Sequence, residues 1–383
     1  MTGSDRIGNA MQSALETGVF PGAVLIVRLR GRVAYERAFG QAALIPEPEP
    51  ATLQTVYDLA SLTKPLATAT AALCLVQERR LSLEQPVQDF LPELQGSEIG
   101  LATPFHLLNH SSGLPAWRPF YERIAERDRD QPGYLGSPAA KDLVLDLIRP
   151  EAVVYPIGTR SLYSDLGFML LGFILERLTG GSLAAFCRSR VHGPMNAAPL
   201  SFLGRGATLS VDPVDDADRD RIDCRLVAPT EDDPWRGRVL RGDVHDENAY
   251  AMGGVAGHAG LFGTASAVLT VSGCWVQAYL GGEGLLSPEL VRHFVARQER
   301  TAGSSWGLGW DTPSAPSSSG TRFSPMSFGH LGYTGTSLWI DPQSQLEVVL
   351  LSNRVHPTRH NNGIQTFRPL IHDLIYQEVI GGS

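Results

Sequence analysis

Segments that favour β-strands lie near both ends of this 383-residue chain, and helical patterns occupy the middle. Residues 23–27 and 33–35 are rich in β-branched and aromatic side chains and flank a short turn, and residues 337–340 and 346–351 repeat this pattern near the other end. A strand needs neighbouring strands to pair its backbone and to bury its apolar face. We therefore expect the two ends to meet in one sheet, with a helical region inserted between them.

These patterns predict an α+β fold in which an antiparallel sheet, formed by both termini and flanked by helices, carries an inserted and mainly helical domain. We assign residues 1–60 and 250–383 to the sheet domain and residues 61–249 to the helical domain. The clearest inserted helix spans 166–178. A polar, acidic passage near 207–247 predicts a long surface loop. The chain is long enough for two packed domains.

The first inserted helix is marked by apolar side chains that recur at spacings of three and four between Leu62 and Val76. This pattern places Ser61 in the first turn. Pro65 removes the N–H that would bond the Ser61 carbonyl, so we expect that turn to be loosened. The free N–H groups at the start of a helix favour negative charge beside Ser61, which is half of what an oxyanion hole provides.

Lys64 follows Ser61 by three positions, so both side chains lie on one face of the helix, within hydrogen-bonding reach. A lysine amine can act as a base when burial lowers its pKa, whereas an arginine cannot. The chain has 32 basic residues, and only Lys64 and Lys141 are lysines. A lysine three residues after a serine therefore stands out in this composition, although an ordinary surface pair on a helix would show the same pattern.

Two further motifs follow along the chain. A Tyr-Ser-Asp tripeptide begins at Tyr163, before an apolar helical segment, and a His-Leu-Gly tripeptide begins at His330, before a strand. With Ser61-Leu-Thr-Lys, they resemble the Ser-x-x-Lys, Tyr-x-Asn and Lys-Thr-Gly motifs of the penicillin-recognising serine hydrolases. That family includes class C β-lactamases, penicillin-binding proteins, DD-peptidases and esterases. Segments 107–114 and 257–262 also look like segments of this family, so the resemblance extends over most of the chain.

The resemblance implies a set of roles for these residues. Ser61 would attack a carbonyl group to form an acyl-enzyme, and Lys64 and Tyr163 would share the proton transfers. Because a tyrosine normally titrates near 10, Tyr163 would need cationic neighbours to serve as the base. Which of the two is the base stays open. The backbone N–H groups of Ser61 and Tyr333 would form the oxyanion hole.

The remaining motif positions, together with Arg354, are candidates for binding the substrate. Gly332 matches the family, but Asp165 stands where asparagine is common, which exchanges an amide donor for an acceptor. His330 replaces a lysine and is expected to be largely neutral above about pH 6.5. Leu331 replaces a threonine or serine, which removes a hydroxyl group. Arg354 could supply a substitute cation for a carboxylate, or it could be an ordinary surface arginine.

The substitutions at Asp165, His330 and Leu331 are not those expected of an efficient β-lactamase. We expect a serine hydrolase that acts on an ester or a D-amino-acid-type amide or peptide bond, with weak or slow turnover of β-lactams. Its partners would be small esters, peptides, β-lactams or peptidoglycan fragments. No cofactor and no metal ion are expected.

Two alternatives come from other functional classes. A non-catalytic penicillin-binding sensor or scaffold would carry the same motifs, because deacylation depends on water placement that a sequence does not reveal. A metallohydrolase is the remoter alternative, since His106/His110 and His356/His360 are spaced by four residues. The first pair lacks the glutamate that a zincin carries beside its first ligand, and Pro357 interrupts the second.

Charge and hydropathy exclude other partners. The net charge is −8 and no extended cluster of basic residues is present, which argues against binding to nucleic acid or an anionic membrane. No apolar run approaches the roughly 18 residues of a membrane span. The start of the chain is polar and shows no secretory signal, so we expect a cytoplasmic protein, or a periplasmic or secreted one if a leader was removed.

Overall fold

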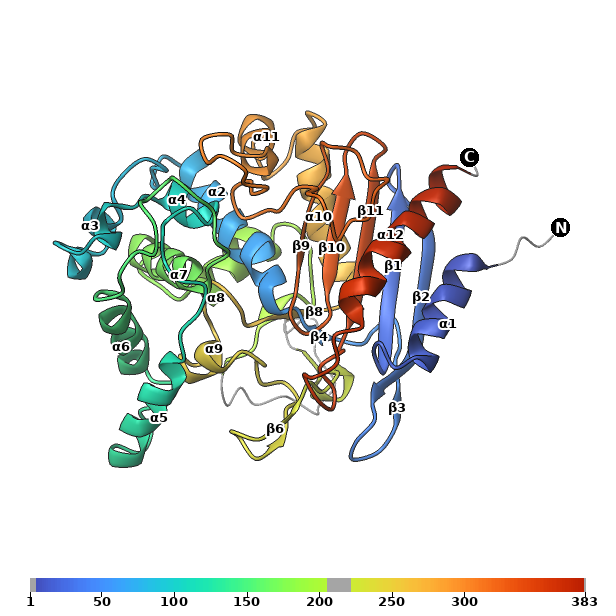
Figure 1. The fold of residues 1–383 in the computed structure, drawn as a ribbon, viewed down its shortest axis with the longest axis horizontal. Coiled ribbons are helices and arrows are strands. Elements are labelled where there is room, and N and C mark those ends of the chain that lie inside the picture. Colours follow the sequence, from blue (N-terminus) through green and yellow to red (C-terminus); the bar gives the residue numbers. More distant parts are fainter. Residues whose placement is uncertain (1–4, 205–221, 382–383) are drawn as a thin grey trace.

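The computed structural model describes residues 5–204 and 222–381, and its main feature is a six-stranded sheet (Figure 1). The strand order is β3-β2-β1-β11-β10-β9, and all neighbours are antiparallel. The strands are β1 (Gly22–Leu29), β2 (Arg32–Ala43), β3 (Glu49–Pro50), β9 (Phe328–Leu331), β10 (Ser337–Asp341) and β11 (Leu346–Ser352). Strand β1 from the start of the chain pairs with β11 from its end. The prediction of one antiparallel sheet formed by both termini is confirmed.

Helices cover both faces of this sheet. Successive side chains of a strand point to opposite faces, so β1 contributes to two apolar clusters. Leu25 and Val27 pack in the cluster that contains helices α1 (Arg6–Glu16) and α12 (Ile364–Ile380). Val24 and Ile26 belong to the larger cluster on the other face, with α10 (Ala265–Tyr279). Figure 1 shows α1 and α12 side by side on the outer face of the sheet.

The inserted region is mainly helical, as predicted. The remaining α-helices of the described residues are α2 (Thr70–Gln77), α3 (Val87–Phe90), α4 (Pro104–Leu108), α5 (Phe120–Asp130), α6 (Pro138–Ile148), α7 (Asp165–Thr179), α8 (Leu183–Cys187), α9 (Glu247–Ala251) and α11 (Pro288–Val295). A small sheet of β4 (Tyr57–Asp58), β8 (Leu261–Gly263) and β5 (Ser201–Phe202) joins this region to the large sheet. One apolar cluster runs through both regions, and the domain boundaries stay a prediction.

No single helix in the described ranges is long and apolar enough to cross a membrane. One bent pair of helical segments, Asp165–Thr179 with Leu183–His192, is long and apolar enough by length and composition only. Most residues of α7 are buried inside the protein, as expected of a core helix.

The helix predicted from Ser61 has an irregular first part. It starts as a 3-10 turn over Ala60–Leu62, continues as a π-helical segment over Lys64–Ala69, and becomes α2 at Thr70. Pro65 cannot donate a backbone hydrogen bond, and the Thr70 hydroxyl donates to the Pro65 carbonyl at 2.8 Å. The loosening at Pro65 therefore extends over more residues than the first turn.

The acidic passage is less exposed than the sequence suggests. Residues 207–221 lie outside the described residues, and 222–247 contain two short paired strands, β6 (Asp232–Asp233) and β7 (Arg238–Val239). Glu231 and Asp233 are buried because each accepts hydrogen bonds from arginine side chains. The assignment of the whole passage as a surface loop therefore stays a prediction, and its described part contains both exposed and buried residues.

Candidate active site

Ser61 lies where the small sheet meets the irregular helix that leads into α2. Asp58, the last residue of β4, is buried, and its carboxylate accepts hydrogen bonds from the N–H groups of Ala60 (2.8 Å) and His245 (2.7 Å). Ala60 has a left-handed backbone with φ of 48°, which costs energy for a residue other than glycine. The Asp58 carboxylate therefore holds the sharp turn that presents the half-buried Ser61.

Lys64 is completely buried, and its ammonium group contacts three other groups. Nζ donates hydrogen bonds to Ser61 Oγ (3.0 Å) and to the carbonyl oxygen of His258 (3.0 Å). It also forms an ion pair with Asp165 Oδ1 at 2.7 Å. The structure thus brings Ser61 and Lys64 together, and it places Asp165 on the lysine.

The Lys64–Asp165 ion pair determines the charge of the lysine. Burial by itself lowers the pKa of the Lys64 ammonium, because a charged group loses its hydration. The Asp165 carboxylate and the Tyr163 phenol outweigh burial, and the net pKa is raised. Lys64 is therefore a cation at neutral pH that donates to the Ser61 hydroxyl.

Tyr163 precedes α7, and its ring centroid lies 4.9 Å from Lys64 Nζ. Burial raises the pKa of the phenol and the Asp165 carboxylate adds to this, whereas Lys64 and Ser61 oppose it; the net pKa is raised. In the resting site the buried hydroxyl makes no hydrogen bond of good geometry with the described residues. Tyr163 is thus close to Lys64 and Ser61, and its phenol carries its proton at neutral pH.

The turn that carries Tyr333 is tied to the chain just before Ser61. The hydroxyl groups of Thr334 and Thr336 donate to the carbonyls of residues 58–59 at 2.7 and 3.0 Å. A Cβ atom on Gly332 would lie 2.6 Å from a carbonyl oxygen of that segment, so this close approach requires glycine. These contacts set the position of the Tyr333 segment relative to Ser61.

Two buried arginines hold the carbonyl groups of the same turn. Arg354 Nε donates to the carbonyl of Tyr333 at 2.9 Å, and its guanidinium lies 4.4 Å from the Tyr333 ring centroid. Arg368 donates to the carbonyls of Gly332 (2.9 Å) and Thr336 (2.7 Å). The alternative of an ordinary surface arginine is wrong for Arg354, because it is buried and bonded to backbone carbonyls.

His330 is buried at the end of β9 and is not a cation. Its Nδ1 donates to the Leu331 carbonyl at 2.8 Å, which leaves Nε2 as the acceptor nitrogen. Burial, reinforced by the positive charge of Lys64, lowers the pKa of His330 to about 3. The imidazole is therefore neutral over a wider pH range than its ordinary pKa would give.

Sequence reasoning missed the residues that support Lys64 from the opposite side. His258, whose carbonyl accepts from Lys64, donates through its ring to the half-buried Asp246 at 2.8 Å. The Gly257 carbonyl accepts a hydrogen bond from Thr68 at 2.6 Å. The resemblance of segment 257–262 to the family was a signal for this strand-forming stretch, but no pattern pointed to Asp246.

Three of the four paired histidines bond backbone groups through their rings. Nδ1 of His106 accepts from the Thr103 N–H (3.2 Å), and Nδ1 of His110 accepts from the Ser164 N–H (3.1 Å). His356 accepts from the Leu44 N–H through Nε2 at 2.9 Å. The described residues contain no group of three histidine, cysteine or acidic side chains that could hold a metal ion.

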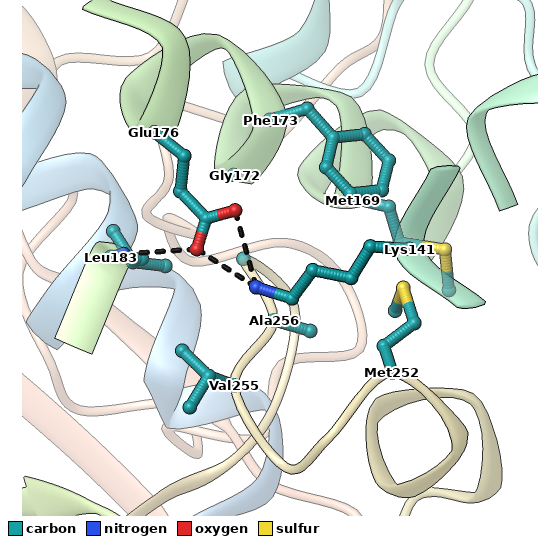
Figure 2. Close-up of a pocket in the computed structure, with 10 residues that line it drawn as sticks. Lys141, Met169, Gly172, Phe173, Glu176, Leu183, Met252, Val255 and Ala256 are labelled. Atoms are coloured by element: carbon teal, nitrogen blue, oxygen red, sulfur yellow. Dashed lines mark hydrogen bonds and ion pairs between the residues drawn. The ribbon is translucent and has the colours of Figure 1, made fainter. Parts of the chain in front are cut away.

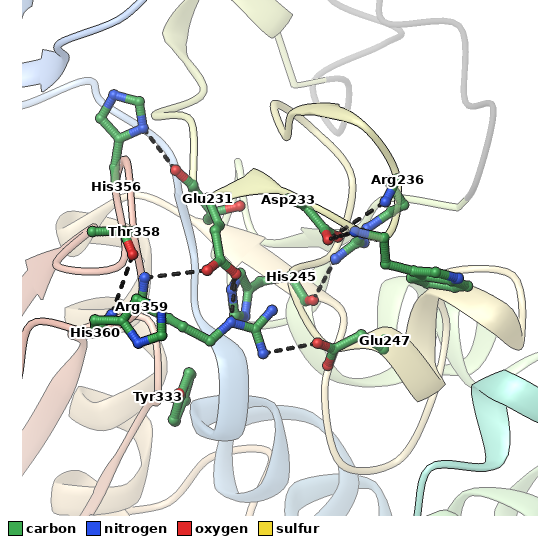
Figure 3. A network of polar contacts seen from close by, with 12 residues as sticks. Glu231, Asp233, Arg236, His245, Glu247, Tyr333, His356, Thr358, Arg359 and His360 are labelled. Carbon is green, nitrogen blue, oxygen red and sulfur yellow. Dashed lines mark hydrogen bonds and ion pairs between the residues drawn. The ribbon is translucent and has the colours of Figure 1, made fainter.

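A charged network lies beside Tyr333 (Figure 3). Arg359 forms ion pairs with Glu231 (2.5 Å) and Glu247 (2.8 Å), and His245 contacts Glu231 at 3.0 Å. The His245 ring stacks against the Tyr333 ring, with centroids 5.7 Å apart. His245 therefore joins this network to Asp58, and so to the turn before Ser61.

The second lysine of the chain makes a comparable ion pair elsewhere. Lys141 Nζ lies 2.8 Å from Glu176 Oε1, beside a small pocket lined by Met169, Phe173 and Met252 (Figure 2). No serine hydroxyl lies among the residues that line this pocket. The pair is thus a suitable reference for the Lys64–Asp165 pair.

The chain is similar to known proteins over most of its length. The family model described as Beta-lactamase matches residues 7–369. A protein of Escherichia coli (strain K12), provisionally named a D-alanyl-D-alanine carboxypeptidase, is 31% identical over 359 residues, which cover 88% of this chain and 79% of that protein. A relative from Salmonella typhimurium with the same name is 30% identical and covers 92% of this chain and 82% of its own length.

Solved structures show a similar fold. EstCE1, a hydrolase with promiscuous acyltransferase activity, superimposes with a TM-score of 0.70 at 23% identity and covers 97% of this chain and 98% of its own. The octameric penicillin-binding protein homologue from Pyrococcus abyssi has a TM-score of 0.72 at 20% identity, with 99% of this chain and 78% of that chain covered. At these identities the likeness concerns the fold alone.

Proposed function

Because this chain belongs to the β-lactamase family, we propose that it is a serine hydrolase that forms an acyl-enzyme on Ser61 and cleaves an ester or a D-amino-acid-type amide bond. The observation that carries the proposal is the completely buried ammonium of Lys64, which donates to Ser61 Oγ at 3.0 Å. Once this ammonium has lost a proton, the lysine amine beside the serine hydroxyl can accept the serine proton, which is what activation of the nucleophile requires.

The reactive form of the site is the one in which the Lys64/Tyr163 pair has lost one proton to solvent, and this form becomes more populated as the pH rises. In that form Ser61 Oγ attacks the carbonyl carbon of the substrate, and the serine proton passes to the pair. The N–H groups of Ser61 and Tyr333 stabilise the negative oxygen of the tetrahedral intermediate. The pair then returns the proton to the leaving alcohol or amine, which departs as the acyl-enzyme forms. A water molecule attacks the ester bond to Ser61 by the same steps, which releases the acid and restores the serine.

Ester substrates are favoured over β-lactams by the charges around the site. A β-lactam carries a carboxylate, which needs a cation or a hydrogen-bond donor in the site. His330 is neutral, the guanidinium of Arg354 is bonded to backbone carbonyls, and Leu331 has no hydroxyl group to donate. Asp165 pairs with Lys64 instead of offering an amide donor. The name of the curated relatives, D-alanyl-D-alanine carboxypeptidase, supports acyl transfer as the reaction class.

The test compares substrates on the purified protein. We expect a higher kcat/KM for short-chain nitrophenyl esters than for a chromogenic cephalosporin, with D-alanyl-D-alanine peptides measured in parallel. Faster cleavage of the cephalosporin would contradict this order. A stable penicillin adduct on Ser61, with no turnover of any ester or peptide, would instead support a penicillin-binding sensor.

Replacing Asp165 with asparagine should shift the pH dependence of the reaction toward acid. The Asp165 carboxylate raises the pKa of both Lys64 and Tyr163, so removing its charge lowers both. Whichever of the two is the base is then deprotonated at lower pH. We expect the acidic limb of the kcat/KM profile for an ester to move down by about 1 pH unit or more.

Glu176→Gln is the matched control for this variant. It removes the carboxylate from the ion pair of the other lysine, Lys141, beside a pocket without a serine hydroxyl. Its profile should coincide with that of the wild type. If the acidic limb of the kcat/KM profile does not move in Asp165→Asn, the Lys64–Asp165 ion pair does not set the pKa of the base.

A further inference from the structure

We propose that His110 is the positioning residue for Tyr163, an inference that rests on the proposed function. The residues on either side of Tyr163 both donate their backbone N–H groups to His110. The Leu162 N–H bonds the His110 carbonyl at 2.9 Å, and the Ser164 N–H bonds Nδ1 of the His110 ring at 3.1 Å. One residue therefore holds the backbone of Tyr163 from both sides.

The His110 ring also supports the phenol ring directly. It is buried, and its centroid lies 4.6 Å from that of Tyr163. Trp306 (4.4 Å) and Phe168 (5.1 Å) pack against the His110 ring and limit its movement. Because the Tyr163 hydroxyl makes no hydrogen bond of good geometry with the described residues, these ring and backbone contacts determine where the phenol lies.

The contact to Ser164 requires one form of the imidazole. A backbone N–H can bond Nδ1 only when that nitrogen carries no proton, so His110 must be neutral and protonated on Nε2. Burial and the positive charge of Lys64 keep the pKa of His110 well below its ordinary value, which agrees with this form. The imidazole therefore accepts from Ser164 and adds no charge beside Tyr163.

The backbone of His110 is shaped for the same purpose. Its φ is 59°, in the left-handed region that few residues other than glycine and asparagine adopt readily. In this conformation its carbonyl accepts from the Leu162 N–H and from the Tyr155 hydroxyl (3.2 Å). A strained residue persists when its surroundings fix it, and here the strain places carbonyl and ring on the two neighbours of Tyr163.

The test uses two variants of His110, one with and one without a side-chain atom that can accept the hydrogen bond from the Ser164 N–H. His110→Asn keeps an acceptor atom on the side chain and tolerates a left-handed backbone, whereas His110→Leu fills space without an acceptor. We expect His110→Leu to lower kcat for ester hydrolysis about 10²-fold with KM nearly unchanged, since small misplacements of a reacting group have effects of this size. His110→Asn should recover a large part of that loss.

His106→Leu is the matched control, because Nδ1 of His106 also accepts a backbone N–H but holds the start of α4. It should lower the melting temperature and leave kcat unchanged. Equal losses of kcat in His106→Leu and His110→Leu would overturn the proposal, as would equal kcat values for His110→Asn and His110→Leu. In a Tyr163→Phe background His110→Leu should have little further effect, and additive losses would also overturn it.

A readout independent of activity separates this proposal from the proposed function. Nitrogen-15 NMR of the wild type should show the His110 imidazole as the neutral form protonated on Nε2. A neutral form protonated on Nδ1 would overturn the positioning role even if the enzyme is active. If the imidazole is neutral and protonated on Nε2 but the protein cleaves no ester or peptide, the placement of Tyr163 by His110 is supported and the proposed hydrolase function is rejected.

Discussion

Ser61→Ala should abolish acyl-enzyme formation and lower ester hydrolysis by about 10⁴-fold or more, because no other group can take the place of the attacking oxygen. The loss should appear in kcat. The overall fold should be retained, since the Ser61 hydroxyl contributes one hydrogen bond, from Lys64, to a site that Asp58 and the Thr334/Thr336 hydroxyls also hold. Labelling by a fluorescent penicillin, with mass analysis of the intact protein, measures the acylation.

Ser189→Ala is the control for this experiment. Ser189 is an exposed serine whose hydroxyl donates to the Ala185 and Phe186 carbonyls of its own helical segment. Its replacement should leave labelling and hydrolysis unchanged. If labelling persists in Ser61→Ala, a different residue is the nucleophile. Loss of labelling in Ser61→Ala alone would assign the covalent bond to this serine.

Tyr163→Phe should lower kcat by about 10²- to 10⁴-fold, which is the contribution of a general acid–base group. The change removes only the hydroxyl, and that hydroxyl makes no hydrogen bond of good geometry in the resting site. The phenylalanine ring keeps the packing against His110 and Trp306. The melting temperature should therefore stay close to that of the wild type while the rate falls.

The pH profile of Tyr163→Phe distinguishes the two possible bases. Burial raises the pKa of Tyr163, so the phenolate forms only in alkaline solution, and kcat/KM of the wild type should rise with pH if the phenolate is the base. That rise should disappear in Tyr163→Phe. If kcat/KM of Tyr163→Phe is lower than that of the wild type but still increases with pH, Lys64 is the base. An unchanged kcat would remove Tyr163 from the mechanism.

The sequence by itself determined the parts of this protein that depend on neighbours along the chain. The continuous apolar run at 23–27 predicted a strand, and the structure places its alternate side chains in apolar clusters on the two faces of the sheet. A spacing of three positions is enough to bring Lys64 to Ser61, because it lies within one helical turn. The order of the three motifs, with the family resemblance, pointed correctly to the β-lactamase family.

Only the tertiary structure decided the charge and the environment of these side chains. Lys64 is held as a cation by Asp165 and by a carbonyl at His258, which come from distant parts of the chain. Arg354 was a candidate for binding a substrate carboxylate or for an ordinary surface residue. In the structure it is buried and donates a hydrogen bond to the carbonyl of Tyr333. His110, considered as a metal ligand, accepts the N–H of Ser164. Burial and pKa depend on which remote segments pack together, and local spacing carries no information about that.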